Sequence, residues 1–132
     1  MKKIIRTVIL ALLFIAVLLT YKTVDADDKV DCNYMPNIER FAICSTYNTW
    51  GYGQYNSLHT IIERESGWNN TAQNPSSTAY GLGQFLNSTW KLGSYEKTSN
   101  PQVQILAMVE YVEVRYNTAN EALIYWNANQ HY

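Results

Sequence analysis

Apolar residues recur at helical spacing in several segments of the chain, and the clearest of these segments lies near its middle. Leu58, Ile61 and Ile62 follow one another at positions i, i+3 and i+4, which places them on one face of a helix. Ser57 is a suitable N-cap and Gly67 a suitable stop. The pattern therefore predicts a helix from about Ser57 to Gly67.

The second half of the chain carries two further helical patterns with local start signals. Asn100-Pro101 combines a cap with a first-turn proline, and a wide apolar arc follows it, so we expect a central helix over 101–116. Thr118 and Glu121 have the spacing of a capping box, which predicts a last helix over 119–126.

The remaining segments are shorter or rich in turn formers. A short helix is expected over 37–45, followed by a loop over 46–56 that is rich in Tyr, Gly and Asn. The segment 68–80 has too many turn formers to be helical. These patterns predict one mainly α domain.

The first 26 residues have the pattern of a secretory signal peptide. Lys2, Lys3 and Arg6 precede an apolar run over 8–19, which has the length of a signal-peptide core rather than of a membrane span of about 20 residues. Val24-Asp25-Ala26 offers small residues at a cleavage site. An uncleaved membrane anchor is the alternative. We expect a secreted or cell-envelope protein.

Removal of 1–26 leaves an N-terminal segment, 27–56, and a core, 57–132. This exported part carries six Lys and Arg against ten Asp and Glu, a formal net charge of about −4. Nucleic-acid binders usually present a basic face, so that class of partner is not expected. Abundant Trp and Tyr among Asn, Gln, Ser and Thr suit a sugar-binding cleft, although several tyrosines must belong to the core.

Two cysteines, Cys32 and Cys44, lie in the N-terminal segment. In an exported protein such a pair suggests a disulfide, which would contribute roughly 3 kcal/mol in the chain-entropy model. Two free thiols are the alternative. No metal site is expected, because His59 and His131 are the only histidines and no Cys/His cluster has ligand spacing. No cofactor is expected either.

Glu65 follows Ile61 and Ile62 by four and three residues, so it lies on the apolar face of the 57–67 helix. A carboxylate in that position is costly unless it is paired or protonated. Desolvation raises the pKa of such a group, as a general acid requires. The alternative is a frayed helix end with Glu65 as a solvated surface acid.

The residues that follow Glu65 resemble a known family. Glu65-Ser66, the loop 67–80, and then Gly81-Leu82-Gly83-Gln84 are similar to the Glu-Ser and Gly-Leu-x-Gln pattern of SLT-type lytic transglycosylases and goose-type lysozymes. Each piece is weak alone, but their order and spacing together are specific. The resemblance implies a lysozyme-like α+β fold, with a short irregular β or loop region beside the catalytic helix.

The resemblance extends over 57–129, with matches and departures in its second half. Tyr111, Asn127 and Ala128 match the family's Asn-Ile-x-x-Gly-x-x-Tyr-Leu and Ala-Tyr-Asn-Ala-Gly segments. Three positions differ: Met108 and Asn129 replace glycines, and Trp126 replaces a tyrosine. An indole donates a hydrogen bond but cannot accept one, which puts the family's tyrosine contact near the acid in question and leaves Tyr125 or Tyr111 as a candidate for that role.

The family's site residues carry over at matching positions. Glu65 is implied as the catalytic general acid and base, and Ser66 and Gln84 as residues that bind the substrate or orient the acid. Tyr111, Tyr125 and Asn127 are further substrate-binding candidates. The structural alternatives are a helix-end serine for Ser66, a surface amide for Gln84, and core packing for the two tyrosines.

A search for a second carboxylate bears on the reaction. The other core acids are Glu63, Glu96, Glu110, Glu113 and Glu121, and none lies in a motif beside Glu65. Glycoside hydrolysis ordinarily uses two carboxylates. A single one fits lytic transglycosylases, in which the muramoyl 6-hydroxyl attacks and yields a 1,6-anhydro product.

The expected protein is therefore a monomeric, exported enzyme that cleaves the glycan strands of peptidoglycan and meets the membrane only through its N-terminal segment. Three alternatives stay open at this point. They are a hydrolytic lysozyme, an inactive wall-binding module on the same scaffold, and a protein that binds a partner through the aromatic loop 46–55.

Overall fold

Helices form most of the part that the computed structural model describes, residues 29–132. The predicted signal peptide lies outside the described residues. The elements in chain order are η2 (Cys32–Tyr34), α2 (Ile38–Trp50), α3 (Tyr55–Ser66), α4 (Asn87–Trp90), α5 (Pro101–Tyr116) and α6 (Ala119–Asn129). No helix in this range has the length and apolar character needed to cross a membrane.

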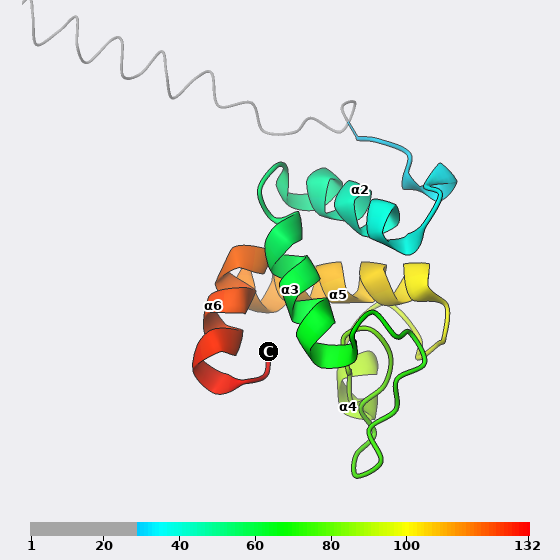
Figure 1. The fold of residues 1–132 in the computed structure, drawn as a ribbon, viewed down its shortest axis with the longest axis vertical. Helices are drawn as coiled ribbons and strands as arrows, with labels where there is room; N and C mark the ends of the chain where they lie inside the picture. Colours follow the sequence, from blue (N-terminus) through cyan, green and yellow to red (C-terminus); the bar gives the residue numbers. More distant parts are fainter. Residues whose placement is uncertain (1–28) are drawn as a thin grey trace, which may run out of the picture.

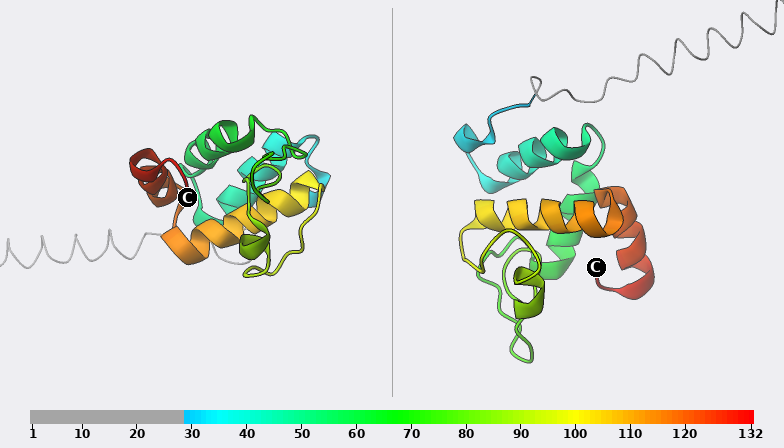
Figure 2. Two further views of the ribbon diagram at one scale, coloured as in Figure 1. Left: turned by 90° about the horizontal axis from the view of Figure 1, so that it is seen from below. Right: turned by 180° about the vertical axis from the view of Figure 1, so that it is seen from behind.

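The helix α5 is central, as its wide apolar arc predicts (Figure 1). The helix α2 packs against α5, and α3 packs against both α2 and α6. The view from behind shows α2 on one side of α5 and α6 at the end of α5 where the chain turns (Figure 2). The mainly α architecture is therefore confirmed.

Local capping residues explain the bounds of the two C-terminal helices. The Asn100 side chain accepts hydrogen bonds from the amides of Gln102 and Val103, and Pro101 follows in the first turn, so α5 begins where predicted. Thr118 caps α6 by accepting from the amide of Glu121. The helix α6 continues to Asn129, three residues beyond the predicted end.

Two predicted bounds in the first half are wrong. The helix α2 continues to Trp50, so the first part of the expected aromatic loop is helical. Ser57 is not the N-cap of α3, which already begins at Tyr55. The Ser57 hydroxyl instead donates to Asn120 on α6, a contact between residues 63 positions apart that no local pattern reveals.

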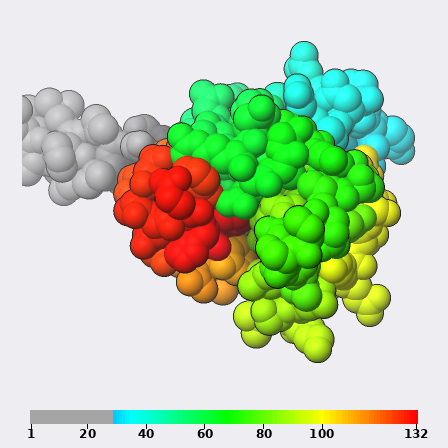
Figure 3. Space-filling view, turned by 60° about the horizontal axis from the view of Figure 1, so that its bottom comes forward, coloured from blue at the N-terminus to red at the C-terminus, as the bar shows by residue number. Residues whose placement is uncertain are grey.

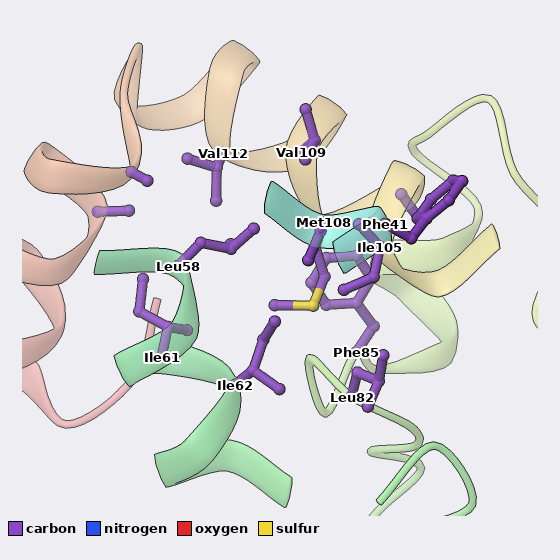
Figure 4. Packing of buried hydrophobic residues seen from close by; sticks show 14 of the residues in the cluster. Phe41, Leu58, Ile61, Ile62, Leu82, Phe85, Ile105, Met108, Val109 and Val112 are labelled. Atoms are coloured by element: carbon purple, nitrogen blue, oxygen red, sulfur yellow. The ribbon is translucent and has the colours of Figure 1, made fainter. Parts of the chain in front are cut away.

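The apolar face of α3 forms the middle of the core (Figure 4). Leu58, Ile61 and Ile62 are fully buried, as are Ile105 and Met108 of α5. Burial of each such side chain contributes roughly 1.5–3 kcal/mol. This packing fixes the direction of α3 and therefore the place where its last residues lie.

The segment between α3 and α4 forms a short irregular β region, as expected. Among the described residues, β pairing is limited to two isolated antiparallel bridges, Gln73 with Tyr80 and Tyr80 with Phe85.

At the other end of the described chain, Cys32 and Cys44 form the predicted disulfide and join η2 to α2.

Candidate active site

The last turn of α3 places Glu65 against α6, and a hollow in the molecular surface lies between α6 and the segment that follows α3. Gly67 ends the helix in a left-handed conformation, with φ of 56°, so Glu65 and Ser66 are its last two residues. Figure 3 shows the hollow between the red C-terminal end of the chain and the green to yellow-green segment that follows α3. Glu65 itself is partly buried.

Trp126 of α6 holds one oxygen of this carboxyl. Its indole Nε1 donates to Glu65 Oε1 over 2.6 Å. Arg64 of α3 fixes the indole in turn, because its guanidinium carbon lies 4.5 Å from the centre of the Trp126 ring. Nη1 of Arg64 also donates to Asn127 Oδ1 over 2.7 Å. Two successive residues of α3 thus bind two successive residues of α6.

The surroundings of Glu65 favour its protonated form. Burial raises the pKa of this carboxyl, while the hydrogen bond from Trp126 and the nearby His131 lower it, and the net shift is upward. The alternative interpretation, in which Glu65 is a fully solvated surface acid, is therefore wrong. No acidic side chain in the range 29–132 is among the groups that shift the pKa of Glu65.

The segment Gly81–Gln84 lies directly beside the end of α3. The Ser66 hydroxyl donates to the carbonyl of Leu82 over 2.9 Å. Gln84 donates through Nε2 to the carbonyls of Ala72 and Gly81, at 3.1 and 3.0 Å. Ser66 and Gln84 thus hold the loop in place, and direct contacts of either residue with a substrate stay predictions.

A buried side-chain amide of α5 supports the segment Gly81–Gln84 through hydrogen bonds. Gln104 of α5 is 1% exposed, and its Oε1 accepts from the amide of Leu82 over 2.8 Å. Its Nε2 donates to the carbonyls of Asn70 and Thr98, at 2.8 and 2.7 Å. Gly81 has φ of 77°, and a Cβ at this position would collide with the Gln104 amide, so both the backbone and the packing require glycine there.

The two candidate tyrosines belong to an aromatic row rather than to the carboxyl. The Tyr111 ring lies 5.0 Å from Phe85 and 6.3 Å from Tyr116. Tyr125 lies 5.2 Å from Tyr116. The side chain that donates to Glu65 is that of Trp126, and a role of Tyr111 or Tyr125 near the acid stays a prediction. Trp126 occupies the position of the family's tyrosine on α6, and its indole N–H supplies the hydrogen bond to the carboxyl.

Asn127, the last of the predicted substrate-binding residues, is exposed and accepts from Arg64. Two neighbours of the site were missed in the sequence, namely His131 and Tyr132, which follow α6. Neither lies in a recognisable motif, and only the turn of the chain after Asn129 brings them back toward α3.

A protein-family model matches most of the chain. The model described as the transglycosylase SLT domain matches residues 43–129. The chain belongs to the transglycosylase SLT domain family. Comparison with curated proteins and with solved structures finds no match.

The match to the SLT domain begins within α2 and covers the whole site, from Glu65 to Trp126 and Asn127. Membership of this family indicates transglycosylase chemistry on peptidoglycan, a substrate that lies outside the cytoplasm.

Proposed function

We propose that this protein cleaves the β-1,4 bond between N-acetylmuramic acid and N-acetylglucosamine in peptidoglycan, with Glu65 as its only carboxyl catalyst. The observation that carries the proposal is one partly buried carboxyl, held by an indole N–H at the end of α3. The family supplies the substrate class.

The first half of the proposed reaction uses the protonated acid. Because Trp126 donates to Oε1, the proton of the neutral carboxyl resides on Oε2. That proton passes to the glycosidic oxygen as the bond from this oxygen to the muramoyl anomeric carbon breaks. The N-acetylglucosamine part leaves with a free hydroxyl, and Glu65 becomes a carboxylate.

In the second half, the Glu65 carboxylate acts as base. It takes the proton of the muramoyl 6-hydroxyl while that oxygen forms a bond to the anomeric carbon. The product is a 1,6-anhydro sugar, Glu65 regains its proton, and no water is consumed. The sugar supplies the nucleophile, which agrees with the absence of a second acidic group acting on Glu65 among the described residues.

The proposal includes export through the N-terminal segment. The Cys32–Cys44 disulfide supports it, because disulfides persist in oxidising compartments and are rare in the cytosol. Peptidoglycan is reached only outside the cytoplasmic membrane, so the substrate and the disulfide require the same compartment.

The test of the catalytic assignment is Glu65→Gln, with Glu63→Gln as its matched control. The amide oxygen of Gln can still accept from Trp126, so the fold should persist, but the amide cannot supply a proton. We expect Glu65→Gln to lower the release of soluble muropeptides from purified cell wall by at least about 10²-fold.

Glu63 is exposed and two positions away, so the control should digest cell wall like the unaltered protein. A folded Glu65→Gln protein that retains activity within a few-fold of the unaltered protein would refute the assignment. A folded, unaltered protein that binds glycan but releases no product would identify an inactive wall-binding module instead.

A further inference from the structure

The residues that follow α6 turn back toward the end of α3, where Glu65 lies. Gln130 ends α6 with φ of 61°, a left-handed conformation that reverses the chain direction. The chain then runs from α6 toward the space beside α3 (Figure 1). Tyr132 is partly buried there, whereas Gln130 and His131 are exposed.

Tyr132 makes specific contacts with α5 and with the segment Gly81–Gln84, which we call the motif loop. Its hydroxyl donates to the carbonyl of Gly83 over 3.1 Å. Its ring lies 5.7 Å from Tyr111 in an edge-to-face arrangement and 6.1 Å from Phe85. Ring pairs of this kind contribute roughly 0.5–1.5 kcal/mol beyond area burial.

Gly83 occupies the third, variable position of the Gly-Leu-x-Gln pattern. The neighbouring Tyr132 explains why a residue without a side chain stands there. A Cβ at position 83 would collide with the Tyr132 hydroxyl and would lie 2.9 Å from Cγ of Met108. The tyrosine therefore fills the space into which a side chain of residue 83 would project.

The charge of Glu65 acts on this tyrosine. Burial raises the pKa of the Tyr132 hydroxyl well above its ordinary value, and the Glu65 charge adds to the shift, followed by Tyr111 and Tyr116. The hydroxyl therefore stays protonated and available as a donor to Gly83. The C-terminal end of the chain, which Tyr132 forms, lies between α3 and α6 (Figures 1 and 2).

Among the described residues, the charged and titratable groups near Glu65 include Arg64, which lies over the Trp126 ring, and His131. His131 acts on Glu65 from the segment after α6, and α6 itself contributes the non-titrating Trp126. The motif loop Gly81–Gln84 carries no titratable side chain. Tyr111 faces Tyr132 from α5. Burial is the largest cause of the upward shift of the Glu65 pKa, and Tyr132 packs beside the motif loop that Ser66 also binds.

We propose that Tyr132 is a positioning residue of the Glu65 site: its ring, packed beside the motif loop, keeps water from one side of the carboxyl, and its hydroxyl fixes the Gly83 carbonyl. The consequence for catalysis depends on the proposed function. The consequence for the protonation of Glu65 does not, because it follows from the geometry of the free protein.

The first test is the titration of Glu65 by carbon-13 NMR of the full chain, with the resonance assigned through Glu65→Gln. Tyr132→Ala admits water, stabilises the charged carboxylate and should lower the pKa of Glu65. Tyr132→Phe keeps the ring and should leave this pKa as in the unaltered protein. Tyr34→Ala, at an 87% exposed tyrosine of η2, is the matched control and should also leave it unchanged.

Activity provides the second readout. The basic limb of the pH profile of kcat/KM reports the Glu65 pKa of the free enzyme, so Tyr132→Ala should move this limb to lower pH. At neutral pH we expect roughly a tenfold loss or more. A Tyr132 that served packing alone would reduce thermal stability without moving the limb.

A third test compares one substitution in two backgrounds, and it checks the placement of Tyr132 even if Tyr132→Ala does not fold. Gly83→Ala should lower activity in the unaltered background, where its methyl group meets the hydroxyl. In the Tyr132→Phe background the same change should be better tolerated, because the colliding oxygen is gone.

An unchanged Glu65 pKa in folded Tyr132→Ala would overturn the inference, as would equal effects of Gly83→Ala in both backgrounds. Neither result would affect the proposed function, which depends on Glu65→Gln. Conversely, an unaltered protein without cleavage activity would overturn the proposed function and leave the titration readable.

Discussion

At the scale of single residues, the pair of Glu65 and Trp126 defines the candidate site. Burial raises the pKa of Glu65, but an indole N–H stabilises the charged form and opposes that shift. The balance suits a residue that must first give a proton and then take one. Because indole only donates, it also assigns the two carboxyl oxygens to different tasks.

This balance predicts the behaviour of Trp126 variants. Trp126→Phe removes the donor to the carboxylate, so the pKa of Glu65 should rise and the basic limb of the pH profile should move to higher pH. A hydrogen bond to a charged group contributes roughly 1.5–3 kcal/mol, so we expect kcat to fall by about 10- to 100-fold. The measurement is a pH series of initial cleavage rates on purified cell wall.

Trp126→Tyr is the matched control, because it restores the family's residue and a hydroxyl donor. It should retain more activity than Trp126→Phe. A basic limb that moves to lower pH in Trp126→Phe would contradict the assigned role of the indole.

At the scale of elements, the site depends on three segments that meet at the end of α3. Arg64 joins α3 to α6, and Ser66 joins α3 to the motif loop. Gln104 then joins that loop to α5 and to the segment before it. The motif loop has little regular structure of its own, so these side-chain hydrogen bonds determine its conformation.

Gln104→Leu tests this dependence. The leucine would leave the amide of Leu82 and the carbonyls of Asn70 and Thr98 without their partner in the protein interior. One such unsatisfied group costs roughly 1–3 kcal/mol, so we expect a loss of at least that size in the free energy of unfolding, measured by urea denaturation.

Gln102→Leu is the control, because Gln102 lies on the same helix but is only partly buried. It should change stability by less than about 0.5 kcal/mol. Equal stability of the Gln104→Leu and Gln102→Leu proteins would show that the buried amide does not support the loop.

At the scale of the whole molecule, local signals in the sequence predicted the helices, and contacts between distant residues had to come from the structure. The start of α5 follows from Asn100 and Pro101, which act on adjacent backbone. The start of α3 was mispredicted because Gln54 caps it without a side-chain hydrogen bond. Capping rules recognise only starts that use a side chain.

The same division holds for the site. Glu65 was recognised from the apolar spacing of its own helix and from the motif that follows it. Its partner Trp126 is 61 positions away, and the contact between Tyr132 and Gly83 spans 49 positions. Sequence distance of this size leaves no periodic pattern, so these neighbours depend on how α6 packs against α3.

The proposed reaction requires that a sugar hydroxyl, and not water, attacks the anomeric carbon while Glu65 transfers both protons. Its most direct test is mass spectrometry of the muropeptides released from purified cell wall in water enriched in oxygen-18. We predict anhydro ends that are lighter by one water than reducing ends and carry no oxygen-18. Reducing ends labelled with oxygen-18 at the anomeric carbon, formed as the first product, would contradict it and identify a hydrolase.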